Sequence, residues 1–146
     1  MDSGKILIQY YFNNRFNQRF NIYKKDEYYV IENLNSKMFM AIKNNSDTIG
    51  TPIIQTKNNN KEGSWWKIEY QGKNLYLIRS AIKSKLLLGI QDNSFDIETP
   101  LVTTTNEEMS LWKIIGFIPH WCISSFVIKF KNTYNHDSKP SYAGKR

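Results

Sequence analysis

Arg19-Phe20-Asn21-Ile22, Trp65-Trp66-Lys67-Ile68 and Leu111-Trp112-Lys113-Ile114 are three short segments that share one aromatic-x-Ile pattern. Their central aromatic residues are separated by 46 positions twice, from 20 to 66 and from 66 to 112. A period of about 20–50 residues is the mark of a fold that is built from repeated supersecondary units. The segments therefore predict a threefold internal repeat.

Residues around these segments keep nearly the same step. The step of 46 relates Gly4 to Gly50, Ile8 to Ile54, Gln9 to Gln55 and Asn13 to Asn59, and a step of 48 relates Tyr28 to Tyr76, Ser36 to Ser84 and Ile42 to Ile90. The apolar runs are short, rich in Ile, Tyr and Val and separated by Asn, Gly, Ser and Pro, which is typical of strands joined by turns. No stretch of helical length has the helical period. We predict an all-β fold, a β-trefoil with three pseudo-symmetric repeats, of which the first lacks its opening strands.

The repeated segments resemble the motif of ricin B-type lectins, a β-trefoil family whose copies end in a Gln-x-Trp or Gln-x-Phe signature. The resemblance rests on Gln9-Tyr10-x-x-Asn13, on Asn17-Gln18-x-Phe20, and on Asn33-x-x-Ser36 before Met40-Ala41-Ile42. It covers roughly residues 3 to 116, and the match is incomplete at the N-terminus. The resemblance implies a carbohydrate-binding module, in the cell-binding part of a toxin or a haemagglutinin.

The resemblance implies a sugar site with three parts. These are an Asp after an upstream strand, an aromatic residue on the next strand and the Asn of an Asn-Gln pair. The aromatic face covers the apolar side of a pyranose, and the polar groups bind its hydroxyls. In the first copy the candidate carbohydrate-binding residues are Tyr10, Asn13, Asn17 and Gln18. The half of this copy that carries the Asp is missing, so we expect a sugar site that has only part of this residue set.

The other two copies lack most of this set. The second copy has Ala41, Thr56 and Gly63-Ser64 at these places, and the third has Gly89, Thr104 and Met109-Ser110. Because a charge-assisted hydrogen bond contributes roughly 1.5–3 kcal/mol, we expect both copies to have lost sugar binding. Asp92, three residues after Gly89, is a hypothetical further ligand contact that would reach the third copy from a loop.

Phe20, Trp66 and Trp112 are expected in the core, because apolar residues at repeated positions fill the interior of such a fold. Ile22, Ile68 and Ile114 extend the same layer. This interpretation assigns the signature aromatics to packing and not to ligand contact.

Charge and composition exclude several classes of function. The chain has 20 Lys and Arg against 13 Asp and Glu, and its net charge of +7 favours acidic surfaces. The lysines are scattered over many turns and strands, so we expect no specific nucleic-acid binding. One cysteine and two histidines give no disulfide and no metal site, and no nucleophile or phosphate-loop motif is present. The sequence indicates a binding module without cofactors and not an enzyme.

The predicted domain spans residues 1–116, and residues 117–146 form a C-terminal extension. Within the extension, residues 126–130 alternate like a strand, and the polar, basic run after them is expected to be disordered. Three arrangements complete the barrel: this strand folds back into the vacant place, an upstream part of a longer protein supplies it, or two chains exchange strands. The apolar residues Phe126, Ile128 and Phe130 favour the first.

Two classes of function remain. The first is a lectin for glycans of the galactose type, and the alternative is an interaction or assembly trefoil with decayed sugar sites, bound to a protein partner or a larger toxin complex. From the first residues we expect no signal peptide, and the longest apolar run is too short for a transmembrane helix. An extracellular location is implied by the resemblance alone.

Overall fold

The computed structural model describes residues 4–11, 19–94, 98–115, 126–130 and 141–144. In this part of the chain it contains strands and three short 3-10 helices, and no α-helix. The strands are β1 (Ile8–Tyr11), β2 (Arg19–Lys25), β3 (Tyr28–Asn33), β4 (Phe39–Ile42), β5 (Ile53–Thr56), β6 (Trp66–Tyr70), β7 (Tyr76–Ser80), β8 (Leu87–Ile90), β9 (Leu101–Thr104), β10 (Trp112–Ile115), β11 (Phe126–Phe130) and β12 (Ser141–Gly144). The 3-10 helices are η2 (Lys43–Asn45), η3 (Glu62–Ser64) and η4 (Gln91–Asn93).

Six strands close into a ring. The antiparallel pairs β2–β3, β6–β7 and β10–β11 are joined end to end by three further pairings, β3–β6, β7–β10 and β11–β2. The other six strands form the pairs β4–β5, β8–β9 and β12–β1. Six barrel strands with three attached pairs are the β-trefoil that the repeat predicts, so this prediction is confirmed.

The three joints of the ring carry the signature aromatics. Phe20 lies opposite Phe126, Trp66 opposite Tyr29 and Trp112 opposite Tyr76. The side chains of Phe20, Trp66 and Trp112 are at most 1% exposed and belong to one hydrophobic cluster.

The isoleucines that follow these aromatics extend the layer. Ile22 and Ile114 are buried in the cluster, and Ile68 packs against it while remaining partly exposed. The assignment of all six positions to packing is therefore confirmed.

The indole N–H of each buried tryptophan also donates a hydrogen bond to a main-chain carbonyl. The indole N–H of Trp66 donates to the carbonyl of Met40 at 3.0 Å, and that of Trp112 donates to the carbonyl of Leu88 at 2.9 Å. These bonds tie β6 to β4 and β10 to β8 in the same way, because the two acceptors are 48 residues apart. Each aromatic thus packs the barrel and fixes the attached strand pair.

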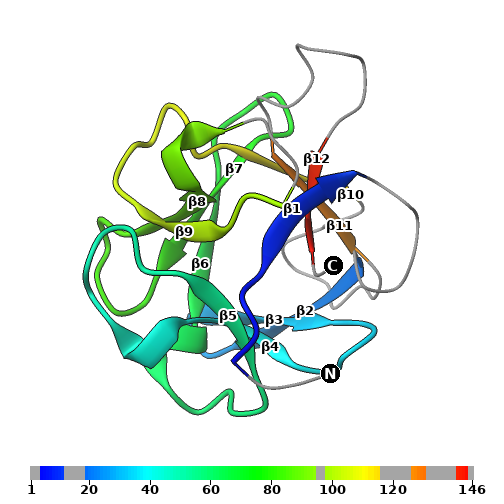
Figure 1. Ribbon diagram of the computed structural model, residues 1–146, viewed down its shortest axis with the longest axis vertical. Coiled ribbons are helices and arrows are strands. Elements are labelled where there is room, and N and C mark those ends of the chain that lie inside the picture. Colours follow the sequence, from blue (N-terminus) through cyan, green and yellow to red (C-terminus); the bar gives the residue numbers. More distant parts are fainter. Residues whose placement is uncertain (1–3, 12–18, 95–97, 116–125, 131–140, 145–146) are drawn as a thin grey trace.

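The strands that complete the first copy come from the far end of the sequence. β11 forms the strand that the alternating pattern indicates at 126–130, and it pairs with β10 on one side and β2 on the other. β12 pairs with β1, so the first and last strands lie side by side (Figure 1). Residues from the predicted C-terminal extension, 117–146, thus contribute two strands to the same sheet.

The expectation of a disordered tail is wrong for Ser141–Gly144, which form β12. These residues carry no alternating apolar pattern, so side chains alone give no strand signal. The backbone of β1 supplies the pairing partner, and an edge strand takes up a partner of almost any composition. The rest of the predicted tail, 131–140 and 145–146, lies outside the described residues.

A change of Trp66 to Phe is expected to lower the free energy of unfolding by about 1–3 kcal/mol. Phe20 shows that a phenyl ring fits the equivalent place, so the main loss is the hydrogen bond to the buried Met40 carbonyl. Trp66→Ala is expected to cost about 3–5 kcal/mol, because it also leaves a cavity. Urea denaturation measures both, and a Trp66→Phe protein as stable as the unchanged chain would contradict the assigned role of the indole N–H.

A chain that ends at Ile115 is expected to lose its monomeric fold, because removal of β11 opens the ring between β10 and β2. Light scattering after size exclusion and urea denaturation test this. A truncated protein that stays monomeric and equally stable would show that the closure described above is dispensable.

Candidate functional site

The structure places one of the four predicted sugar-binding residues in the fold. Tyr10 lies in β1 with its backbone opposite Tyr142 of β12, and only its backbone is described. Asn13, Asn17 and Gln18 lie outside the described residues. The equivalent positions of the second copy lie within the described residues.

The register of the three attached strand pairs defines this equivalence. Tyr10 opposes Tyr142 in β12–β1, Thr56 opposes Phe39 in β4–β5, and Thr104 opposes Leu87 in β8–β9. Tyr10, Thr56 and Thr104 thus occupy one position in three copies. The sequence comparison of these three residues is consistent with this register.

The same register identifies the residue that stands where the family's Asp is expected in the first copy. Ile8 opposes Gly144, just as Ile54 opposes Ala41 and Val102 opposes Gly89. Sequence reasoning missed Gly144, because this residue reaches the first copy from the opposite end of the chain. None of the three copies has a carboxylate at this strand position.

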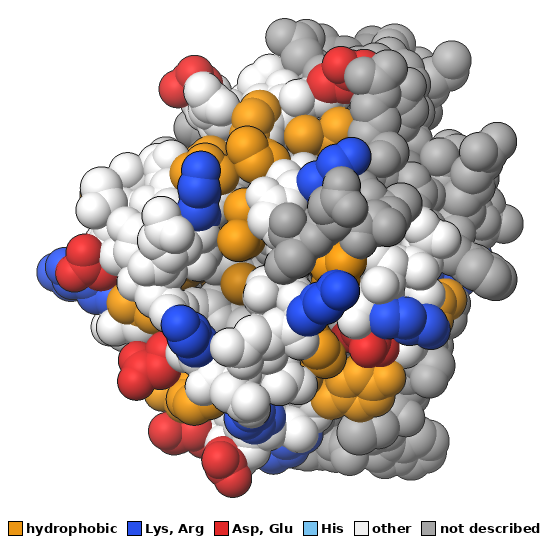
Figure 2. Space-filling view, turned by 60° about the horizontal axis from the view of Figure 1, so that its bottom comes forward, with side chains coloured by type: hydrophobic (Ala, Val, Ile, Leu, Met, Phe, Trp, Pro, Cys, Tyr) orange, Lys and Arg blue, Asp and Glu red, His pale blue; other side chains and the backbone are white. Residues whose placement is uncertain are grey.

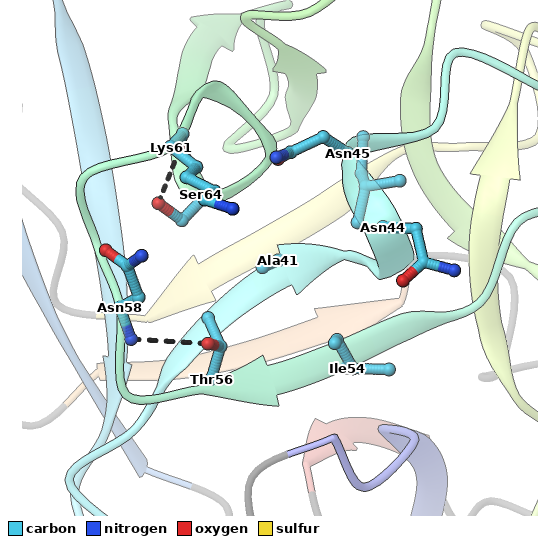
Figure 3. A pocket seen from close by; sticks show the side chains of 9 residues that line it. Ala41, Asn44, Asn45, Ile54, Thr56, Asn58, Lys61 and Ser64 are labelled. Carbon is cyan, nitrogen blue, oxygen red and sulfur yellow. Dashed lines mark hydrogen bonds between the residues drawn. The ribbon is translucent and has the colours of Figure 1, made fainter.

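The second copy contains a hollow of about 220 Å³ at this place (Figure 3). Ala41 lies in the middle, with Asn45 and Ser64 on one side and Ile54 and Thr56 on the other. The full lining is Ala41, Ile42, Asn44, Asn45, Ile54, Thr56, Asn58, Lys61 and Ser64. Thr56 and Ser64 thus line one hollow in the second copy.

Several polar atoms around the second-copy hollow already take part in local hydrogen bonds. The side-chain oxygen of Asn45 accepts the N–H of Gly63 at 2.9 Å. The hydroxyl of Ser64 donates to the carbonyl of Lys61 at 2.8 Å, and that of Thr56 accepts the N–H of Asn58 at 3.2 Å. These three groups hold the loop between β5 and β6.

Gly63 stands where the first copy has Asn17, and the structure shows why a side chain is absent. A Cβ at this position would collide with the side-chain oxygen of Asn45 and would lie 3.2 Å from the carbonyl of Ile42. The amide of Asn45 thus occupies the space that a side chain at position 63 would need. The step of 48 that relates Ile42 to Ile90 also relates Asn44-Asn45 to Asp92-Asn93, and it was the signal for these loop residues.

In the third copy, Gly89 is the strand position equivalent to Ala41, and neighbouring side chains fill the space beside it. A Cβ on Gly89 would lie 2.5 Å from the methyl group of Thr104 and 3.2 Å from the hydroxyl oxygen of Ser110. The hydroxyl of Ser110 is buried and has no hydrogen-bond partner among the described residues. The side chain of Thr104 therefore takes the space next to Gly89.

Asp92 of η4 adopts the same left-handed conformation as Asn44 of η2, with φ of 53° and 57°. Short polar Asn and Asp side chains tolerate this region better than most residues do. Asp92 lines a hollow of about 710 Å³ together with Thr104 and Asn106. Asp92 is exposed.

Charged side chains do not gather into a basic face in the view of Figure 2, where Lys and Arg are separated by acidic and uncharged side chains. Among the described residues, no three His, Cys, Asp or Glu side chains are grouped so that they would hold a metal ion. Nor does this part of the chain contain a helix long and apolar enough to cross a membrane.

Solved structures of similar fold include ThreeFoil, a designed threefold-symmetric protein. The two sequences are 19% identical, the TM-score is 0.72, and the match covers 77% of this chain and 81% of ThreeFoil. A mosquitocidal holotoxin matches 93% of this chain with 18% identity and a TM-score of 0.68. An exo-β-1,3-galactanase from Clostridium thermocellum matches 82% with 18% identity and a TM-score of 0.61. The matched region is 15% of the holotoxin and 23% of the galactanase.

A search of the curated proteins gave no match. The sequence model of the family described as "Ricin-type beta-trefoil lectin domain-like" matches residues 16–104, which is more than half of the chain. The threefold ring, the buried signature aromatics and the strand register of the attached pairs agree with this match. The chain therefore belongs to the ricin-type β-trefoil lectin domain-like family.

Proposed function

We propose that this chain is a carbohydrate-binding module whose sugar site lies in the first copy. The observation that carries the proposal is the repeat equivalence of Tyr10 with Thr56 and of Gln18 with Ser64, because the two second-copy residues line one hollow. A tyrosine at position 10 offers a ring face where Thr56 offers a methyl group. Asn17 and Gln18 add amide donors and acceptors, and Asn13 belongs to the same connection.

Gly144 changes what this site offers to a sugar. The position lacks a side chain, so no carboxylate from β12 binds the ring hydroxyls. The proposed site therefore relies on stacking against Tyr10 and on the amides of Asn17 and Gln18. We expect it to bind weakly and to prefer a sugar with a broad apolar face, as galactose-type sugars have.

The family and two of the similar structures support a role in recognising glycans. One of these structures is an exo-β-1,3-galactanase, and another is a mosquitocidal holotoxin. We propose a galactose-type glycan as the ligand and the cell-binding part of a toxin or haemagglutinin as the setting.

An interaction or assembly trefoil with decayed sugar sites is the second candidate. The observation that favours it is the state of the second and third copies, where Asn45 and Thr104 fill the places of ligand groups. Exposed apolar side chains also line the hollow beside the third copy, with Ile6 at 42% and Ile49 at 60% exposure. A protein partner would cover such side chains.

A glycan array at about 0.15 M salt tests the lectin proposal, because this ionic strength screens diffuse attraction to the basic chain. Tyr10→Ala is expected to weaken binding of a galactose-type glycan about tenfold or more, since each 1.4 kcal/mol of lost stacking and contact is a factor of ten. Tyr70→Ala is the matched control, because Tyr70 is 59% exposed and lies on the β6–β7 hairpin away from this place. If the folded chain bound no glycan, or if both variants lost binding equally, the result would argue against the first-copy site.

The decayed-site alternative makes a prediction about stability. If the second-copy groups serve only the turn, Gly63→Ala is expected to cost about 1–3 kcal/mol, because the new methyl group displaces the Asn45 amide. The double change Gly63→Ala with Asn45→Gly is expected to cost less than the sum of the two single changes. A double-mutant cycle by urea denaturation measures the coupling, and strict additivity would mean that the two residues do not compete for one space.

A further inference from the structure

A separate hollow of about 270 Å³, called here the Lys67 hollow, lies between strands β3, β6 and β7 and the turn after β7. Its lining is Tyr28, Lys67, Glu69, Arg79, Ser80, Ala81, Ser84 and Lys85. None of these residues lines the second-copy or third-copy hollow. The Lys67 hollow is therefore distinct from the sites that the repeat relates to one another.

A fixed row of aromatic and ammonium groups borders this hollow. The rings of Tyr28 and Trp65 stack with centroids 6.2 Å apart and planes 24° apart. The ammonium of Lys67 lies 5.6 Å from the Tyr28 ring centroid, and that of Lys25 lies 5.0 Å from the Trp65 centroid. Such cation–π contacts hold a lysine head group in place at a partly solvated surface.

One backbone carbonyl holds both Trp65 and Lys25 in place. The carbonyl of Asn59 accepts the indole N–H of Trp65 at 2.8 Å and the ammonium of Lys25 at 3.1 Å. Trp65 is thereby fixed against the loop, and Tyr28 is fixed against Trp65. Lys67 is consequently presented to the hollow by a rigid base, which lowers the ordering cost of binding a ligand.

The acidic group in the lining is already neutralised. Arg79 donates to the carboxylate of Glu69 at 2.8 Å, to that of Glu107 at 3.0 Å and to the carbonyl of Ser84 at 2.9 Å. The Glu69 hydrogen bond also raises the pKa of Arg79, so this guanidinium remains charged. Among the described residues, no carboxylate forms an ion pair with Lys67 or Lys85.

The Lys67 hollow therefore offers two unpaired ammonium groups beside an aromatic ring and serine hydroxyls. Because Arg79 is paired with Glu69 and Glu107, the positive charge of the lining comes from Lys67 and Lys85, and this charge favours an anion. Its volume is below the range of about 300–1,000 Å³ typical of drug-sized ligands, so it suits a single ring with a charged substituent. We propose that the Lys67 hollow binds an anionic saccharide, one that carries sulfate or carboxylate groups, as a second glycan site that rests on the proposed lectin function.

A single-stranded nucleic acid is a poorer fit. Such ligands are held by aromatic side chains whose faces are open for successive bases. Here Tyr28 and Trp65 stack on each other, and lysine head groups lie over both rings. The rings thus position cations instead of offering a stacking platform.

Calorimetric titration of the full chain at about 0.15 M salt tests the proposal with three probes: a heparin hexasaccharide, its desulfated and N-acetylated form, and a ten-nucleotide oligo-dT. The first probe is expected to bind, and the second shows whether carboxylates suffice or sulfates are required. Lys67→Gln with Lys85→Gln is expected to weaken binding about tenfold or more. Lys43→Gln with Lys57→Gln removes the same charge from exposed lysines outside all three described hollows and is expected to weaken it less than threefold.

Two further variants sharpen the result. Glu107→Gln frees part of the Arg79 charge and is expected to tighten binding about two- to threefold. Tyr10→Ala is expected to leave heparin binding unchanged, so a failed first-copy site and a failed Lys67 hollow give different results. The assignment would be overturned if heparin did not bind or if both lysine pairs weakened its binding equally. Loss of heparin binding with Tyr10→Ala, or weaker binding with Glu107→Gln, would also overturn it. So would oligo-dT binding that depends on the same lysines.

Discussion

Closure of the ring between β11 and β2 is the constraint on which the rest of the structure depends. The joint pairs Phe126 with Phe20 and Val127 with Arg19, and it completes the circle that the other two joints begin. Without it, the three signature aromatics would not share one enclosed core, since each lies at a joint. Main-chain hydrogen bonds set the position of the joint, and the burial of Phe20, Trp66 and Trp112 stabilises it.

The same closure assembles the proposed sugar site from both ends of the chain. β11 carries the chain to β12, and β12 sets Gly144 opposite Ile8 and Tyr142 opposite Tyr10. The first copy thus has a ring-bearing residue on one strand and no carboxylate on the other. In the second copy the same two strand positions carry Thr56 and Ala41, and the loop amide of Asn45 takes part of the space. The trefoil therefore keeps three equivalent places while their chemistry has diverged.

The sequence was sufficient to predict the ring and its core, because the aromatic-x-Ile segments recur at one step and the buried layer follows that step. It was insufficient for β12, since Ser141–Gly144 pair through the backbone and show no apolar alternation. The clash that excludes a side chain at Gly63 depends on the position of Asn45, eighteen residues earlier in the chain. The row from Lys25 to Lys67 depends on how β3 and β6 are aligned, which single-strand patterns do not contain.

The central claim is that the sugar site is built where the first and last strands meet. Chemical-shift mapping of the backbone amides during titration with a galactose-type disaccharide tests it most directly. The account predicts shifts confined to residues 8–18 and 141–144, with the amides around Thr56 and Ser64 unchanged. Shifts that cluster around Thr56 and Ser64 or around Asp92 and Thr104 would contradict it, as would the absence of any shift at saturating sugar.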